Sequence, residues 1–316
     1  MKLLPYKIIA KVKGIFTDPI QYRPLLENGD SESFFGNYEG QRYGNYDTSD
    51  CWCFSGAEIL ETRLEMLEKL GLIPQETIDW AQANGYKDAD GDWYISRRWI
   101  AILSNVRDQG NYQLNFWGLA SVLGVIPNAM LPYSQQQAYQ KVSRNDFNND
   151  YYNGGVITPE MQALGKEFLK RFKIQAENIS GGFMKNIDVS LKTYLKEGSL
   201  QIGIPVPQDG TWNKQNIDYP TKRYNADHAV ELYKYDPTQK YPFYIYDSYE
   251  PHLKQLSSDY YIPIITRVAI TPILPTVQAP IVTPVSNWSM FWSNVSAWLQ
   301  KLPIPYPNVP IGGSKL

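Results

Sequence analysis

Cysteine and histidine are scarce in this chain. Its 316 residues include two cysteines, Cys51 and Cys53, and two histidines, His228 and His252. A single residue separates the two thiols, which leaves too short a loop for ordinary disulfide geometry, so we expect a fold without disulfide bonds. Such a chain fits a reducing compartment, although it can reside anywhere.

A large excess of charge and long apolar runs are also missing. The formal net charge is -2, so the chain lacks the strongly basic character of nucleic acid binding proteins, and we expect no nucleic acid partner. Near the N-terminus, Lys7, Lys11 and Lys13 interrupt each apolar run. We therefore expect neither a secretion signal nor a transmembrane helix.

Metal ligands with a recognisable spacing are lacking too. The acidic turn Asp88-Ala-Asp90-Gly91-Asp92 is superficially similar to a calcium loop, but its glycine is in the wrong place and Trp99 stands where a bidentate glutamate is needed. We expect neither a metal nor another cofactor.

What the chain does contain is a change of pattern along its length. From Cys51 to Leu70, apolar residues recur every three or four positions and charged residues fill the other face, which predicts an amphipathic helix with Asp50 as its N-cap. We expect further helices at 74–84, 96–106, 115–123 and 159–172, and a polar connection at 145–154. From about residue 187, β-rich runs between turn residues predict strands. Helices followed by strands indicate an α+β fold.

The phase of the first helix separates the two cysteines. At 100° per residue, Cys51 and Cys53 point about 200° apart, so they cannot both serve one site. Cys53 falls on the buried stripe, whereas Cys51 lies in the first turn. Because the positive end of the helix dipole favours a thiolate, Cys51 is a candidate nucleophile; the alternative is a partly buried structural thiol.

A nucleophilic thiol needs a base, and His228 is the better placed histidine. It begins the alternating run HAVELY, whereas His252 follows a proline in a turn and is expected to be solvated. The strand YPFYIYD ends at Asp247 and would pair with the His228 strand through the turn at 236–240. This hairpin would place Asp247 beside His228, where it could orient the ring. The alternatives are a structural histidine and an ordinary turn aspartate.

Three motifs resemble those of the papain family of cysteine peptidases. SDCWCFS at 49–55 resembles the family's nucleophile motif G-S-C-W-A-F-S, DHAV at 227–230 is similar to N/G-H-A-V around its catalytic histidine, and YDSY at 246–249 resembles K-N-S-W. Weaker similarities at 96–104, 110–133 and 187–206 extend the resemblance over roughly residues 20–268.

The resemblance implies a papain-like α+β fold, with a helical left lobe, an antiparallel barrel-like right lobe and a cleft between them. It implies that Cys51 attacks a peptide bond, that His228 is the base and that Asp247 orients it. The family's oxyanion glutamine would correspond to Gln41, with Asn45 as the alternative. The chain departs from the family at Asp247, which replaces asparagine, and at Tyr249, which replaces tryptophan.

The resemblance also suggests how the chain is divided. We expect an N-terminal arm at 1–40, a peptidase domain at 41–268 with its left lobe ending near 150, and a proline-rich tail at 269–316. An aromatic amphipathic helix at 288–302 would dock on its own domain, bind a partner protein or lie on a membrane surface. The fifty residues before Cys51 are too few for the family's inhibitory propeptide.

The motif style is closest to divergent phage and uncultured-bacterial members, so we expect a cytoplasmic or virion-associated enzyme. The expected substrate is a peptide or a protein. Two alternatives stay open: a papain-fold assembly protein with weak or no catalysis, and an isopeptidase or transpeptidase that uses the same triad.

Overall fold

The structure is a computed structural model that describes residues 20–36, 38–106, 110–153, 157–219 and 225–274. The chain divides into two units, residues 1–274 and 275–316, and the described residues belong to the first. The predicted helix at 288–302 lies outside the described residues.

Helices dominate the first half of the described chain. The α-helices are α1 (Cys51–Lys69), α2 (Gln75–Ala83), α3 (Arg97–Ser104), α4 (Gln113–Leu123), α5 (Gln135–Tyr139), α6 (Arg144–Asn153), α7 (Pro159–Leu169) and α8 (Met184–Leu195). Short 3-10 helices are η2 (Glu32–Phe34), η3 (Asn128–Met130) and η4 (Thr211–Asn213).

The described strands are concentrated in the second half, apart from a short pair between residues 42 and 47. They are β1 (Arg42–Tyr43), β2 (Tyr46–Asp47), β3 (Phe172–Phe183), β4 (Leu200–Ile204), β5 (Asn216–Ile217), β6 (His228–Tyr235), β7 (Phe243–Tyr246), β8 (Leu253–Leu256) and β9 (Tyr261–Pro272). The α+β class predicted from the sequence is confirmed.

Two local predictions were wrong. The polar stretch at 145–154 forms most of α6, because Phe147 and Tyr151 recur at helical spacing and are both buried. The strands also begin earlier than residue 187, with β3, whose alternating residues Phe172, Ile174 and Ala176 are buried.

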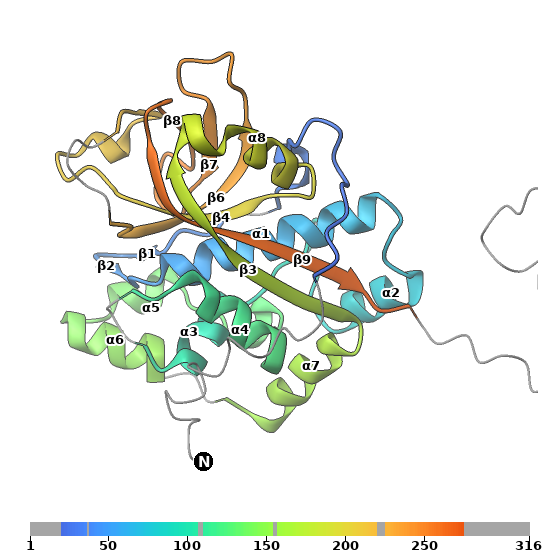
Figure 1. The fold of residues 1–316 in the computed structure, drawn as a ribbon. Coiled ribbons are helices and arrows are strands. Elements are labelled where there is room, and N and C mark those ends of the chain that lie inside the picture. Colours follow the sequence, from blue (N-terminus) through green and yellow to red (C-terminus); the bar gives the residue numbers. More distant parts are fainter. Residues whose placement is uncertain (1–19, 37, 107–109, 154–156, 220–224, 275–316) are drawn as a thin grey trace, which may run out of the picture. The chain divides into compact units, whose positions relative to one another are not determined.

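Seven strands form one sheet in the order β3-β9-β4-β6-β7-β8-β5. The neighbours pair antiparallel except β5 and β8, which are parallel. β3 and β9 are long partners, running from Phe172 opposite Pro272 to Phe183 opposite Tyr261 (Figure 1). β9 therefore continues past residue 268, where the sequence had placed the start of the tail.

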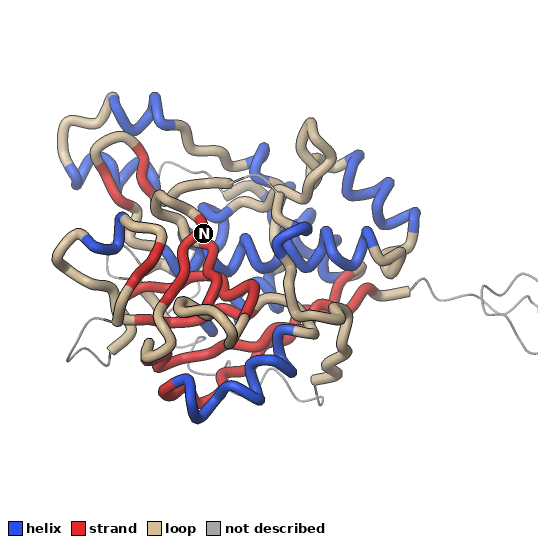
Figure 2. Tube along the Cα trace, turned by 90° about the horizontal axis from the view of Figure 1, so that it is seen from above, coloured by secondary structure: helices blue, strands red, loops and turns tan. Residues whose placement is uncertain are grey.

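The helix α1 lies between the sheet and other helices. It contacts β6, β4 and β9 as well as α3 and α4, and Figure 2 shows the main group of helices on one side of the strands. Amphipathic spacing placed its charged residues on the face opposite the buried stripe, but Glu58, Glu61, Arg63 and Glu65 are buried as well. The correction has a physical cause, because the helix is covered on both sides and several of these charges find partners inside.

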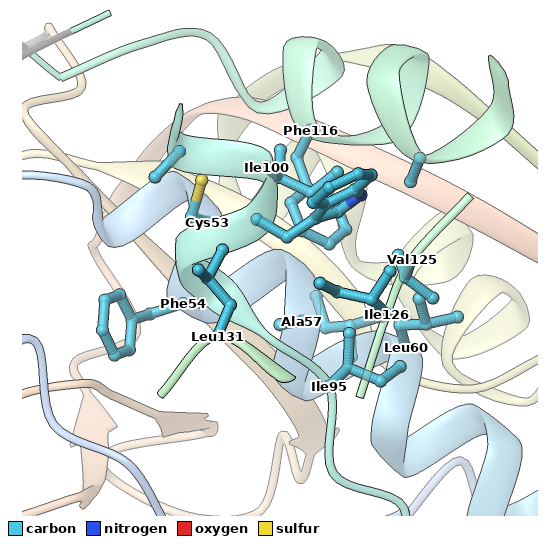
Figure 3. Packing of buried hydrophobic residues seen from close by; sticks show 14 of the residues in the cluster. Cys53, Phe54, Ala57, Leu60, Ile95, Ile100, Phe116, Val125, Ile126 and Leu131 are labelled. Atoms are coloured by element: carbon cyan, nitrogen blue, oxygen red, sulfur yellow. The ribbon is translucent and has the colours of Figure 1, made fainter. Parts of the chain in front are cut away.

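Within the described residues, the buried apolar side chains form two clusters. One joins the helices and includes Cys53, Ile100 and Phe116, which Figure 3 shows side by side; the other lies between the sheet and α8, around Leu191 and Ile202. The complete burial of Cys53 confirms that helix phase directs this thiol into the core.

Candidate catalytic site

Cys51 is the first residue of α1 and is partly exposed, whereas Cys53 is fully buried. Burial raises the pKa of the Cys53 thiol well above its ordinary value. A protonated, inaccessible thiol cannot act as a nucleophile, so Cys51 is the candidate of the two.

Asp50 occupies the N-cap position, but its side chain makes no capping hydrogen bond. The predicted cap was wrong in this respect. The carboxyl group is buried instead, where it accepts hydrogen bonds from the Thr48 hydroxyl and from the Tyr151 hydroxyl at 3.0 Å. Asp50 therefore anchors the loop before α1 to α6, and burial raises its pKa well above the ordinary value.

His228 begins β6 and is 6% exposed. Its Nε2 lies 2.7 Å from Oδ1 of Asp247, which follows β7 directly. The predicted β6–β7 hairpin is present, with Glu231 opposite Tyr246. This pairing gives both side chains a rigid support.

The charge of His228 is set by its neighbours. Burial lowers the pKa of the ring, but the charges and hydrogen bonds of Asp247 and Cys51 raise it more, so that the pKa of His228 is about 10. Because Nε2 faces Asp247, the other ring nitrogen, Nδ1, remains for the thiol of Cys51. The ring thus has a carboxylate on one side and a thiol on the other.

A buried lysine stands behind the aspartate, and the sequence did not predict it. Nζ of Lys254, in β8, lies 2.6 Å from Oδ2 of Asp247, and neither side chain is exposed. Burial raises the pKa of Asp247, but His228 and Lys254 lower it more, so the net pKa is below the ordinary value. Burial also lowers the pKa of Lys254, against the raising effect of Asp247. No sequence pattern distinguishes Lys254, because Leu253 beside it is 39% exposed, the reverse of the usual order.

Two aromatic rings pack against His228. The ring centroid of Trp212, in η4, lies 5.6 Å from that of His228, and the centroid of Tyr249 lies 5.2 Å away. The sequence pointed to Tyr249 through its position after Asp247. It missed Trp212, which comes from a loop between β4 and β5.

Gln41 is buried beside the segment that follows Asp247. Its Oε1 accepts a hydrogen bond from the Ser248 hydroxyl at 2.6 Å, and its Nε2 donates to the Tyr249 hydroxyl at 2.6 Å and to Asp47 Oδ1 at 2.8 Å. Asn45, the alternative, is exposed in the turn between β1 and β2. Gln41 is therefore linked to Tyr249, whose ring packs against His228.

The loop between Gln41 and Cys51 has its own constraint. Asp47 Oδ1 also accepts the backbone N–H of Ser49 at 2.8 Å, and the Tyr249 hydroxyl donates to the other oxygen of Asp47. Ser49 has a φ of 57°, in the left-handed region that side chains seldom adopt. Asp47 thus links Gln41, Tyr249 and the approach to Cys51, a role that the sequence did not reveal.

Glu39, two residues before Gln41, forms contacts with Arg97 and Tyr94. One carboxyl oxygen lies 3.3 Å from Nε of Arg97, which is itself paired with Glu61 of α1 at 2.7 Å. Tyr94 donates a hydrogen bond to Glu39 at 3.2 Å. Gln41 is therefore positioned between a buried ion-pair network and the turn after β7.

A surface hollow of about 550 Å³ lies in the loops that flank η4. Its lining includes Asp209, Thr211, Lys214 and Asp218. Thr211 is adjacent to Trp212, which contacts His228. Over the described part of the chain, no group of three or more His, Cys, Asp or Glu side chains is arranged to hold a metal ion. Nor does any described helix have the length and apolar character to cross a membrane.

Comparison with known proteins gives structural matches only. No protein-family model and no curated protein matches the sequence. The structure is similar to the Amb a 11 cysteine protease of ragweed pollen in its proform, with 13% identity and a TM-score of 0.46; the match covers 86% of this chain and 65% of that one. Procathepsin L 3 of the Tenebrio molitor larval midgut matches with 13% identity and a TM-score of 0.48, covering 85% of this chain and 78% of that one. Bromelain from Ananas comosus matches with 13% identity and a TM-score of 0.43, covering 78% of this chain and 98% of that one.

Proposed function

We propose that the chain is a papain-like cysteine peptidase that hydrolyses peptide bonds with Cys51 as nucleophile, His228 as base and acid, and Asp247 as the orienting group. The observation that carries this proposal is that the ring of His228 interacts with two groups. It hydrogen-bonds with the thiol of Cys51, and its Nε2 lies 2.7 Å from Oδ1 of Asp247. A partly exposed thiol at a helix N-terminus, paired with an oriented imidazole, is the arrangement that thiol-based acyl transfer requires.

The first half of the reaction forms a thioester. The Cys51 thiolate attacks the carbonyl carbon of the substrate, the carbonyl oxygen becomes an oxyanion, and the C–N bond then breaks. The His228 imidazolium gives its proton to the departing amine. With a pKa of about 10, His228 holds that proton at neutral pH.

The second half releases the acid. Neutral His228 removes a proton from a water molecule, which attacks the thioester carbon. The C–S bond breaks, the acid product leaves and the thiolate–imidazolium pair is restored. The hydrogen bond that Nε2 of His228 donates to Asp247 keeps the ring in one orientation throughout.

Gln41 is the proposed donor to the oxyanion, together with the backbone N–H of Cys51. It is supported by its burial and by its hydrogen bonds to Ser248 and Tyr249, which tie it to the turn that carries Asp247. In this proposal its Nε2 exchanges a hydrogen bond to Asp47 or Tyr249 for one to the developing oxyanion.

The source, location and further partners remain part of the proposal. The motif style favours a phage or uncultured bacterial enzyme that acts in the cytoplasm or in a virion, and the tail at 288–302 would dock a protein. The hollow lined by Thr211 is a candidate site for one side chain of a peptide substrate, because the next residue, Trp212, packs on His228.

A peptide-library digest tests the proposed function. We expect the full chain to cleave some peptides, Cys51→Ser to cleave none and Cys53→Ser to retain cleavage, because Cys53 is buried in the core. Mass spectrometry would identify the products and any covalent adduct on Cys51.

The same digest separates the alternatives. A reactive Cys51 with no cleaved linear peptide, but with cleavage of side-chain amide links or exchange of amines, would favour an isopeptidase or transpeptidase. An unreactive Cys51 would favour an assembly protein and would contradict a peptidase.

A further inference from the structure

We propose that Lys254 is a positioning residue whose charge balances that of Asp247, so that the two side chains act on His228 as one neutral hydrogen-bond acceptor. The inference rests on the proposed function, because it concerns the residue that orients the base.

The surroundings of Lys254 fit a charged ammonium group. Its Nζ donates to Oδ2 of Asp247 at 2.6 Å, to the carbonyl oxygen of Tyr249 at 2.5 Å and to that of Pro251 at 2.6 Å. An ammonium group has three N–H donors, and these three acceptors match them in number. All three acceptors belong to the turn between β7 and β8, so Lys254 also fixes the shape of that turn.

The two oxygens of Asp247 divide their contacts. Oδ1 faces His228 at 2.7 Å and Oδ2 faces Lys254 at 2.6 Å, and the Asp247 side chain is fully buried. A buried carboxylate without a positive partner is strongly unfavourable. Lys254 supplies that partner on the side away from the ring.

The chemistry gives this partner a role. His228 changes from imidazolium to neutral imidazole when it protonates the departing amine. If His228 were the only positive group near Asp247, that step would leave a buried, uncompensated carboxylate. Because Lys254 stays charged, Asp247 keeps its partner in both halves of the reaction, and the cost of moving the proton is reduced.

The departure from the papain-family motif supports the same conclusion. The family pattern has a neutral asparagine where this chain has Asp247. An aspartate paired with a lysine has the same net charge as an asparagine and offers the ring an oxygen acceptor. Trp212 covers the pair, since its ring lies 5.2 Å from Nζ of Lys254 and 5.6 Å from the ring of His228.

Other charged and titratable groups surround the pair and are the same in every variant compared, except that Cys51 is alanine throughout the titration. Cys51 and Glu58 approach from α1, and Tyr38 approaches from the segment before Gln41. Tyr249, Glu250 and His252 belong to the turn itself. Differences among variants of Asp247 and Lys254 therefore report on these two side chains.

The test is a direct titration of His228 by NMR, which is practical because the chain has two histidines. The full chain is labelled with ¹³C-histidine in a Cys51→Ala background, so that the result does not depend on thiol chemistry. Removing a positive charge should raise the titration midpoint, so we expect Lys254→Met to shift His228 upward by about one pH unit.

The matching variants give opposite and compensating shifts. Asp247→Asn should lower the midpoint by about one unit, because it removes the negative charge and leaves the lysine. The double variant Asp247→Asn with Lys254→Met should return to within about half a unit of the parent. Lys234→Met is the control, since Lys234 lies at the far end of β6 and pairs with Asp30; it should leave the midpoint unchanged.

The second readout is peptide hydrolysis by the same variants with Cys51 retained. Lys254→Met and Asp247→Asn should each reduce kcat/KM about tenfold or more. The kcat/KM of the double variant should be higher than that of the less active single variant. No upward shift in Lys254→Met, or a double variant no better than the weaker single variant, would overturn the inference.

Two further outcomes are decisive. If Lys254→Met does not fold, Lys254→Gln, which keeps hydrogen-bond donors without the charge, should give the upward shift. If neither folds, a folded double variant with the parent midpoint supports charge balance, whereas an unfolded double variant overturns it. Failure of the proposed function itself would look different: the parent would show no hydrolysis, whatever the histidine midpoints.

Discussion

Gln41 donates both of its amide hydrogens within the protein, one to Asp47 and one to Tyr249. An oxyanion donor in this position must exchange one of these contacts during the reaction. The exchange is favourable only if the new acceptor carries more negative charge than the old one. A developing oxyanion carries more negative charge than the hydroxyl oxygen of Tyr249, so giving up that contact is favourable.

We predict that Gln41→Ala lowers kcat by about 100-fold or more with a smaller change in KM, because the lost hydrogen bond is made in the transition state. Asn45→Ala is the matched comparison and should stay within about twofold, since Asn45 is exposed. Steady-state kinetics on a cleaved peptide would measure both. A larger loss in Asn45→Ala would reverse the assignment.

The site residues proposed from the sequence are those that regular elements hold. Cys51 lies at a helix start, His228 begins one strand of a hairpin and Asp247 directly follows the other, so helix phase and strand pairing place all three from the sequence. Lys254 and Trp212 could not be found this way. Their roles depend on how a turn and a loop fold back on His228, which no periodic pattern records.

Among the elements, α1 matters most, because it carries Cys51 and is surrounded by protein on both sides. Where it crosses α4, Gly56 faces the ring of Phe116, and a Cβ at Gly56 would lie 2.6 Å from a ring carbon. That distance is shorter than real Cβ contacts, so the helices approach this closely only with glycine at this position.

We predict that Gly56→Ala destabilises the protein by about 1–3 kcal/mol, despite the better helix propensity of alanine. In the control variant Gly182→Ala the nearest neighbouring atom to the new Cβ lies at 3.6 Å, an ordinary contact, so overpacking should not contribute. Urea unfolding of both variants measures the difference. A Gly56→Ala chain as stable as wild type would show that α1 and α4 do not pack this closely.

The elements that the sequence missed share a cause. α6 has few apolar residues, and its helix is stabilised by aromatic rings, such as the stacked pair Phe147 and Tyr151 at 5.7 Å. Polar composition alone therefore gave the wrong prediction at 145–154. For α1 the helix was right and its surroundings were wrong, because amphipathic spacing cannot reveal that a charged face is also covered.

At the scale of the whole molecule, the main feature is that acidic side chains of α1 and β6 are buried where the helix packs on the sheet. Glu231 of β6 is fully buried, and burial raises its pKa to about 7 against the lowering effects of the Ser199 and Thr62 hydroxyls and of Arg63. Glu58 of α1 is also buried, and its pKa is raised well above the ordinary value. A raised acid pKa means that the folded state holds a proton that the unfolded state has already released.

We predict that the raised pKa of Glu231 lowers the free energy of unfolding as pH rises. The contribution of Glu231 is fully present below its unfolded pKa, near 4.5, and is lost as pH increases through about 7. The loss is about 3 kcal/mol for a shift of this size.

Denaturant unfolding between about pH 5 and pH 8 measures that slope. In Glu231→Gln, which cannot ionise, the decline in unfolding free energy should be smaller than in wild type. An identical decline in the two proteins would mean that Glu231 is not protonated in the fold at low pH.

The measurement that bears most directly on the proposed function is the rate at which iodoacetamide alkylates Cys51 at about pH 6, where an ordinary thiol is almost fully protonated. If His228 holds Cys51 as a thiolate, wild type should react about 100-fold faster than His228→Gln, and the adduct should lie on Cys51 and not on Cys53. Equal rates in wild type and His228→Gln would contradict a Cys51–His228 catalytic pair.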